Sequence, residues 1–156
     1  MLTYIKKQRI QMALNIQLIR LSKKYNTSLP KLVLDKKEGS YIGHYDYETH
    51  TILLDPNKLH GYRDYMIALR HEFRHHWQWT HHHKDYMWWI EHYDIYESLY
   101  PYSIIEIDAR LFSSNEELDN DEIFEIFPTE KVEQAYQQGF LMEACKYLAD
   151  VAESDL

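Results

Sequence analysis

Two histidines and a glutamate stand at a spacing that can hold a metal ion and activate a water molecule. His71, Glu72 and His75 form the pattern H-E-x-x-H inside residues 65–79, a run that contains no Gly or Pro. Residues four apart lie on one face of an α-helix, so both imidazoles can reach a single tetrahedral ion. The carboxylate of Glu72 can then take a proton from the activated water and pass it to a leaving amine. These residue types predict hydrolysis of a peptide bond.

A catalytic zinc site needs a third protein ligand, and the sequence offers several candidates. Glu106 opens a helical E-x-x-A-x-x-F pattern in which Ala109 leaves room for another helix to approach. His81 could also complete the site, but only if the helix breaks after His75, and residues 76–80 contain no helix breaker. A continuous helix carries His81 about 9 Å along its axis from His75. Glu106 is therefore favoured over His81. The remaining histidines that could serve as ligands are His82, His83 and His92.

The same motif could instead belong to a helix that displays His and Glu at the surface without any metal. Apolar residues at Leu69, Phe73 and Trp77 argue against this alternative, because they would bury the helix in the centre of the domain. Unpaired imidazoles and a carboxylate are costly to keep in such a place. A bound metal ion would remove this cost.

Hydrophobic periodicity predicts an α+β fold in a single domain over residues 1–156. Strands 41–45 and 51–54 should form a hairpin that contains Gly43. The His-, Trp- and Tyr-rich segment 80–103 is predicted to be a short helix or an irregular excursion, and the acidic segment 116–122 a solvated turn. The other predicted elements are helices over residues 4–25, from Asp64 to 79, over 104–112 and over 130–151, and a strand over 32–34.

Composition narrows the function classes. The chain has 17 Lys and Arg against 25 Asp and Glu, with the basic residues scattered, which argues against a nucleic-acid surface. The N-terminal segment lacks the unbroken apolar core of a signal peptide, and no stretch is long and apolar enough to span a bilayer. The single Cys145 cannot form an intramolecular disulfide. We therefore expect a cytoplasmic protein without a nucleic-acid or membrane partner.

The order of these features resembles the gluzincin zinc metallopeptidases, especially minimal single-domain forms and the ImmA/IrrE-like peptidases. The resemblance spans residues 32–112 and implies a zincin-like fold, with Zn²⁺ held by His71, His75 and Glu106 and with Glu72 as general base and acid. It also implies that the strand over 41–45 pairs with an extended peptide or protein substrate. The chain departs from the family pattern at Arg110, where relatives often carry Asp or Asn that orients a ligand. No histidine follows His92 to stabilise an oxyanion.

The sequence therefore favours a zinc-dependent endopeptidase, and several alternatives remain open. The zinc could be purely structural in a binding or regulatory module, although a structural site gains little from Glu72. An enzyme that cleaves one regulatory partner is a further possibility. An SprT-like zincin with a histidine as third ligand is another, and His81 keeps it open. The aromatic residues of 86–102 are expected mainly to pack, and a tyrosine hydroxyl among them is the best oxyanion donor.

Overall fold

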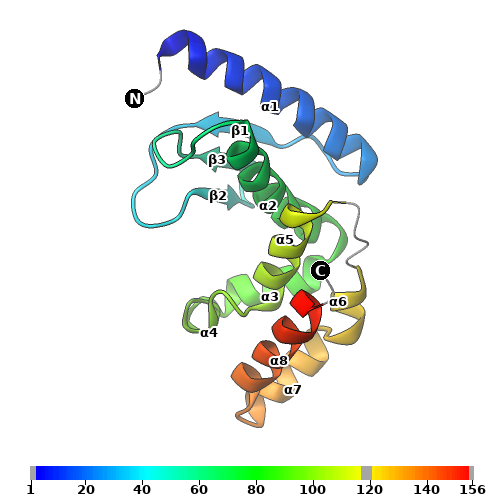
Figure 1. The fold of residues 1–156 in the computed structure, drawn as a ribbon. Coiled ribbons are helices and arrows are strands. Elements are labelled where there is room, and N and C mark those ends of the chain that lie inside the picture. The colour runs from blue at the N-terminus through cyan, green and yellow to red at the C-terminus, as the bar shows by residue number, and fades with distance from the viewer. Residues whose placement is uncertain (1–2, 117–120, 155–156) are drawn as a thin grey trace.

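The computed structural model describes residues 3–116 and 121–154 and has an α+β fold, as predicted (Figure 1). Within these residues the chain forms eight helices and one small mixed sheet of three strands. In chain order the elements are α1 (Tyr4–Lys24), β1 (Lys31–Leu34), β2 (Gly43–Asp46), β3 (Thr51–Leu54), α2 (Tyr62–His81), α3 (His83–Glu91), α4 (Tyr93–Leu99), α5 (Ile104–Ser114), α6 (Asp121–Ile126), α7 (Thr129–Gln137) and α8 (Leu141–Ser154).

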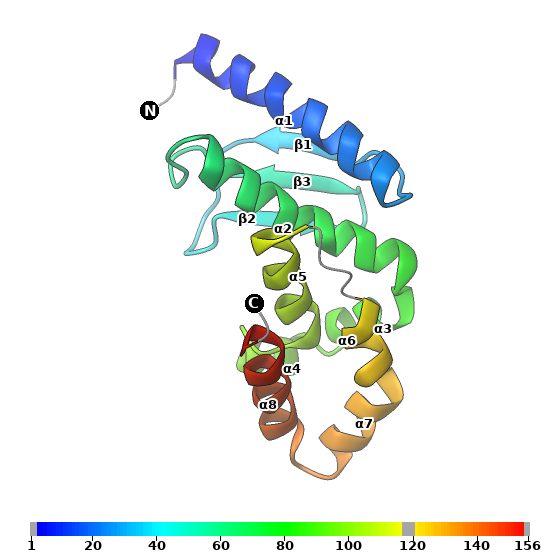
Figure 2. The same cartoon turned by 45° about the vertical axis from the view of Figure 1, so that its right-hand side comes forward.

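The sheet has the strand order β1-β3-β2, with β1 parallel and β2 antiparallel to the central strand β3. The predicted hairpin is confirmed, because Tyr45 pairs with Ile52 and Gly43 with Leu54. Figure 2 shows α1 lying beyond β1 and α2 running across the face of the sheet. Strand β2 is therefore left at the opposite edge of the sheet, beside α2.

Helix α1 forms much as its periodicity predicts. Thr3 caps its first turn, since its hydroxyl accepts a hydrogen bond from the Lys6 amide at 3.3 Å. One face is buried through Leu14, Leu18 and Leu21, which are fully inaccessible to solvent. This face packs the helix against β1 and α2.

Helix α2 is continuous to His81, as predicted from the absence of a helix breaker after His75. Its start differs from the prediction: Gly61, with φ 90°, occupies the N-cap, and Asp64 lies inside the first turn. The Asp64 carboxylate instead accepts a hydrogen bond from the His60 amide at 3.1 Å. A glycine suits this position because a positive φ is strained for other residues.

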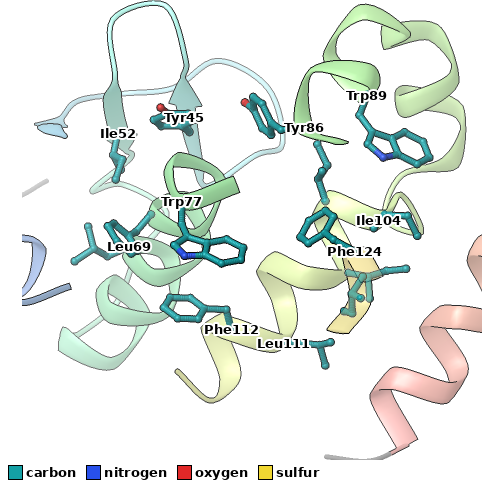
Figure 3. Packing of buried hydrophobic residues seen from close by; sticks show 14 of the residues in the cluster. Tyr45, Ile52, Leu69, Trp77, Tyr86, Trp89, Ile104, Leu111, Phe112 and Phe124 are labelled. Atoms are coloured by element: carbon teal, nitrogen blue, oxygen red, sulfur yellow. The ribbon is translucent and has the colours of Figure 1, made fainter. Parts of the chain in front are cut away.

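Helix α5 crosses α2 and packs closely against it. Ala109 and Phe112 are fully buried, and Figure 3 shows Trp77 of α2 beside Phe112 of α5. The guanidinium of Arg74 lies 3.4 Å from the Trp77 ring centroid and 4.9 Å from that of Phe112. A small, fully buried residue such as Ala109 suits this close packing, which lets residues of α5 reach the face of α2 that carries the motif.

The C-terminal half corrects two predictions. Residues 80–103 are mostly helical, since α3 and α4 occupy most of the segment. The single helix predicted over 130–151 is two helices, because α7 ends at Gln137 and the chain turns at Gly139, with φ 80°, before α8 begins. The Phe140 amide bonds to the Ala135 carbonyl and the Gly139 amide to that of Tyr136, which is the Schellman termination of a helix.

The acidic segment predicted as a solvated turn lies partly outside the described residues, at 117–120. Its first residue is not a free surface group. Glu116 forms ion pairs with Arg20 at 3.0 Å and with Arg70 at 3.5 Å. No helix in the described part of the chain is long and apolar enough to cross a membrane.

Gly43 at the start of β2 has no room for a side chain. A Cβ atom there would lie 2.9 Å from Leu54 Cδ2, 3.0 Å from the Leu53 carbonyl oxygen and 3.2 Å from Glu72 Cγ. We therefore expect Gly43→Ala to lower the free energy of unfolding by about 1–3 kcal/mol through overpacking. Chemical denaturation measures this, with the exposed Ser40→Ala as control. Equal stability of both variants and the wild type would show that β2 can move away from α2.

Candidate metal centre

Helix α2 presents His71 and His75 on one face, one turn apart. Their ring centroids are separated by 5.0 Å and their planes are nearly perpendicular, at 82°. The His75 side chain is buried, whereas His71 is partly open to solvent. The motif spacing therefore aims both imidazoles at one point, and solvent reaches this point from the side of His71.

Glu106, in the first turn of α5, brings its carboxylate to the same point. Its Oε2 lies 2.9 Å from His71 Nε2 and its Oε1 lies 3.2 Å from His75 Nε2. Neighbouring ligand atoms around a tetrahedral zinc ion are separated by roughly 3.3 Å, given metal–ligand bonds of about 2.0–2.1 Å. Within residues 3–116 and 121–154, these three are the only His, Cys, Asp and Glu residues whose ligand atoms cluster closely enough to hold a metal ion.

Opposite charges at this point stabilise one another. Burial disfavours a charged His75, but the Glu106 carboxylate, together with Glu72 and Gln78, outweighs burial and raises the pKa of His75 to about 9. Burial likewise disfavours a charged Glu106, yet His75 and His71 hold the pKa of Glu106 well below its usual range. The imidazole nitrogens of His71 and His75 and the Glu106 carboxylate are also the kinds of donor that bind a divalent cation.

The other candidate ligands lie elsewhere. His81 Nε2 is within 3.0 Å of the Tyr25 carbonyl oxygen and 2.9 Å of that of Asn26, at the end of α1. His82 stacks on Phe124, with ring centroids 4.4 Å apart. His83 and His92 approach the carbonyl oxygens one turn before them in the chain, those of Trp79 and Trp88 respectively. The structure brings none of these four histidines to His71 and His75.

A buried chain of hydrogen bonds orients His75. Its Nδ1 lies 2.9 Å from Gln78 Oε1, and the Gln78 amide donates to Asp108 Oδ2 at 2.7 Å and to the Ile105 carbonyl at 2.9 Å. Arg74 in turn holds both carboxylate oxygens of Asp108, at 2.8 and 3.2 Å. An Nδ1–H that donates to Gln78 leaves the lone pair of Nε2 available to a metal ion.

This chain of contacts was not predicted. The sequence suggested that the orienting residue of α5 was lost because Arg110 stands at the expected position. Arg110 instead binds the Pro101 carbonyl and Glu153, and Asp108 supplies the orienting carboxylate through Gln78. Gln78 and Asp108 both lie on helices that the sequence predicts, but the contact between them depends on how these helices cross.

Glu72 follows His71 on α2 and lies against the start of β2, in the space that Gly43 leaves open. In the part of the chain that the structure describes, no hydrogen bond or ion pair engages its carboxylate. The side chain lines the same cleft as His71, His75 and Glu106. Glu72 is thus available to exchange a proton with a molecule bound in the cleft.

The cleft has two adjoining hollows of about 260 and 620 Å³. His71, Glu72 and Gly43 line both of them, as do Tyr41 and Tyr100. The rings of Tyr41 and Tyr100 meet edge to face, with centroids 5.4 Å apart. The two tyrosines therefore stand at the junction of the hollows, next to the candidate metal ligands.

Tyrosines expected mainly to pack form much of the smaller hollow. Tyr86, Tyr93, Tyr96 and Tyr100 line it, and the Tyr96 hydroxyl donates a hydrogen bond to Glu106. Figure 3 shows Tyr86 with its ring turned toward Tyr45 of β2. Trp88 and Trp89 do pack in the core, as expected. The density of aromatic residues in the sequence indicated burial but not which of them face the cleft.

Comparison with known proteins adds no relative: no protein-family model, curated protein or solved structure matches this chain.

Gln78 provides a test of the orienting chain. We expect Gln78→Leu to weaken zinc binding about 10- to 100-fold, because His75 loses the acceptor that fixes its ring. Competition with a chelating dye measures the affinity, and denaturation in excess chelator separates it from any loss of metal-free stability. The control is Thr80→Ala on the same helix, whose hydroxyl only bonds to the His76 carbonyl. Equal zinc affinity in both variants would remove Gln78 from the site.

Proposed function

We propose that this protein is a zinc-dependent endopeptidase of the gluzincin type, with a zincin-like fold. The observation that carries this proposal is the meeting of His71 and His75 with Glu106, beside an unengaged Glu72, on the wall of an open cleft. A purely structural site would not need the carboxylate of Glu72 or a route for a substrate. The donor set leaves one tetrahedral position for water, which is the usual composition of a catalytic zinc site.

The donor types favour zinc over harder cations. Two imidazole nitrogens with one carboxylate suit Zn²⁺, whereas Mg²⁺ and Ca²⁺ prefer shells made of oxygen. When bound, zinc would polarise a peptide carbonyl and lower the pKa of a water molecule. The remaining steps fall to the side chains of the cleft.

Glu72 is the proposed general base and acid. Its carboxylate would accept the proton of the attacking water and deliver it to the nitrogen of the departing amine, so the proton is conserved over the reaction. Burial of the side chain near His75 and Glu106 keeps competing solvent away from the proton. The protein thus supplies both halves of the proton transfer with one residue.

Tyrosine hydroxyls are the proposed donors to the oxyanion. Burial, with Glu106 and Tyr41 nearby, raises the pKa of Tyr100 to about 12, so its hydroxyl stays protonated at neutral pH. Tyr96 also stays protonated, because burial and then Glu106 raise its pKa, and its hydroxyl already bonds to Glu106. Tyr96 therefore suits positioning of a metal ligand, and Tyr100, at the junction of the hollows, suits contact with substrate.

The substrate is proposed to be an extended segment of a protein or peptide. Strand β2 is at the edge of the sheet and runs along the cleft, where Gly43 and His44 line the smaller hollow. An edge strand can bind an extended chain by adding it to the sheet. We also propose that the protein acts in the cytoplasm, on the basis of its single, buried Cys145.

The metal assignment can be checked by elemental analysis. Freshly purified protein is expected to carry or take up one zinc ion per chain, and His71→Ala, His75→Ala and Glu106→Ala should each lose it. Thermal stability should fall with the metal, because binding to the folded state is linked to folding. His81→Ala should keep zinc, because the His81 side chain contacts the carbonyl oxygens of Tyr25 and Asn26 instead of the candidate ligands. Loss of zinc with His81 and its retention without Glu106 would replace the proposed ligand set.

The catalytic assignment is tested by Glu72→Gln. This variant should keep zinc and the fold, because Glu72 is not a proposed metal ligand. Its rate of peptide hydrolysis should fall by about two or more orders of magnitude, because the group that transfers the proton is lost. Cleavage of a peptide library followed by mass spectrometry gives the rate on the best substrate. Glu91→Gln, an exposed carboxylate at the end of α3, is the control. Unchanged turnover in Glu72→Gln would exclude it from the mechanism.

A further inference from the structure

The outward face of α1 carries apolar side chains that the fold leaves exposed. Ile5, Met12, Ile16 and Ile19 are 61%, 66%, 62% and 42% exposed, although the opposite face of the same helix is fully buried. Figures 1 and 2 show α1 at the rim of the molecule, with the sheet and α2 on its inner side. Scattered exposed apolar residues are common, but a row along one helix face is typical of an interaction site.

The row has the spacing of a coiled-coil seam. Steps of seven, four and three residues separate its members, so they fall on alternating core positions of a heptad repeat. Two basic residues, Arg9 and Lys23, occupy the remaining core positions of the same seam within α1. Like the four apolar residues, they are exposed. The six residues, called here the α1 seam, are Ile5, Arg9, Met12, Ile16, Ile19 and Lys23.

The charge of α1 is opposite to that of the chain as a whole. The helix carries six of the 17 Lys and Arg residues and none of the 25 Asp and Glu residues, in a chain of net charge −8. A carboxylate already binds at its flank, since Arg20 holds Glu116 through two hydrogen bonds at 3.0 and 3.1 Å. An occupant of the α1 seam should therefore be acidic. A second copy of α1 is a poor occupant, because it would bring together two helices that each carry six basic residues and no acidic one.

We propose that the α1 seam docks an acidic amphipathic helix of another protein. Its apolar side chains would cover Ile5, Met12 and Ile16, and its carboxylates would pair with Arg9 and Lys23. The narrow width of the seam favours a helix over a lipid surface, because helices that lie in a membrane present a broader apolar face rich in Trp, Phe and Leu. Charged residues within the seam would also be buried in lipid, whereas a helix can pair them.

The test uses the full-length protein and a fluorescent designed peptide of three heptads, with Leu and Ile at its core positions and Glu facing Arg9 and Lys23. We expect saturable binding by fluorescence anisotropy that weakens as salt is raised. The double variant Met12→Asp/Ile16→Asp should bind about tenfold or more weakly, because two apolar contacts are lost. Both residues are exposed, so its thermal unfolding should match that of the wild type. Tyr147→Asp, equally exposed on α8, is the matched control and should bind normally.

A charge exchange makes the test specific. Arg9→Glu/Lys23→Glu should lose the acidic peptide and gain a peptide in which the facing Glu residues are Lys. The proposal would be overturned if the acidic peptide does not bind the wild type, or if neither double variant changes its binding. So would association with phosphatidylserine vesicles, or a dimer in sedimentation, that the Met12→Asp/Ile16→Asp variant abolishes. None of these outcomes depends on zinc or on peptidase activity.

Discussion

The crossing of α5 over α2 is the contact on which the candidate site depends. At its centre the Arg74 guanidinium binds Asp108, and both side chains are almost fully buried. Removing one partner of such a pair leaves a buried charge, which typically costs about 3–5 kcal/mol. The pair therefore disfavours sliding or rotation of one helix against the other. Because Glu106 is two residues from Asp108, the same contact sets where the carboxylate meets His71 and His75.

The site concentrates groups that are poorly tolerated in a protein interior without partners. His75 and Glu106 are buried, and Glu72 lies close by with no partner among the described residues. Mutual pairing of the imidazoles and Glu106 relieves part of the desolvation cost, as the raised pKa of His75 and the lowered pKa of Glu106 indicate. A cation would satisfy the same donors more completely, and Glu72 would remain outside this set.

Local patterns predicted the parts of the structure that depend on short spacing. The continuity of α2 follows from the absence of Gly and Pro, the hairpin and α5 follow from their apolar patterns, and each was confirmed. The break at Gly139 was missed although glycine is the usual residue at a positive φ, because the apolar pattern continues on both sides of it. The contact of Gln78 with Asp108 and the tyrosine lining of the cleft depend on tertiary packing. No local spacing encodes them.

The choice of an amide at Gln78 has an electrostatic consequence. A carboxylate there would accept the same hydrogen bond from His75, but it would add a third negative charge beside Glu72 and Glu106 and would repel Asp108. The amide accepts from His75 with its oxygen and donates to Asp108 with its nitrogen, so it passes on the orientation set by the Arg74–Asp108 pair without a charge of its own. Burial lowers the pKa of His75, and the charge that raises it comes mainly from Glu106, the group that would share its proposed metal ion. In this arrangement the crossing of α5 over α2 fixes the positions of the candidate ligands, and the charges of His75 and Glu106 depend mainly on each other.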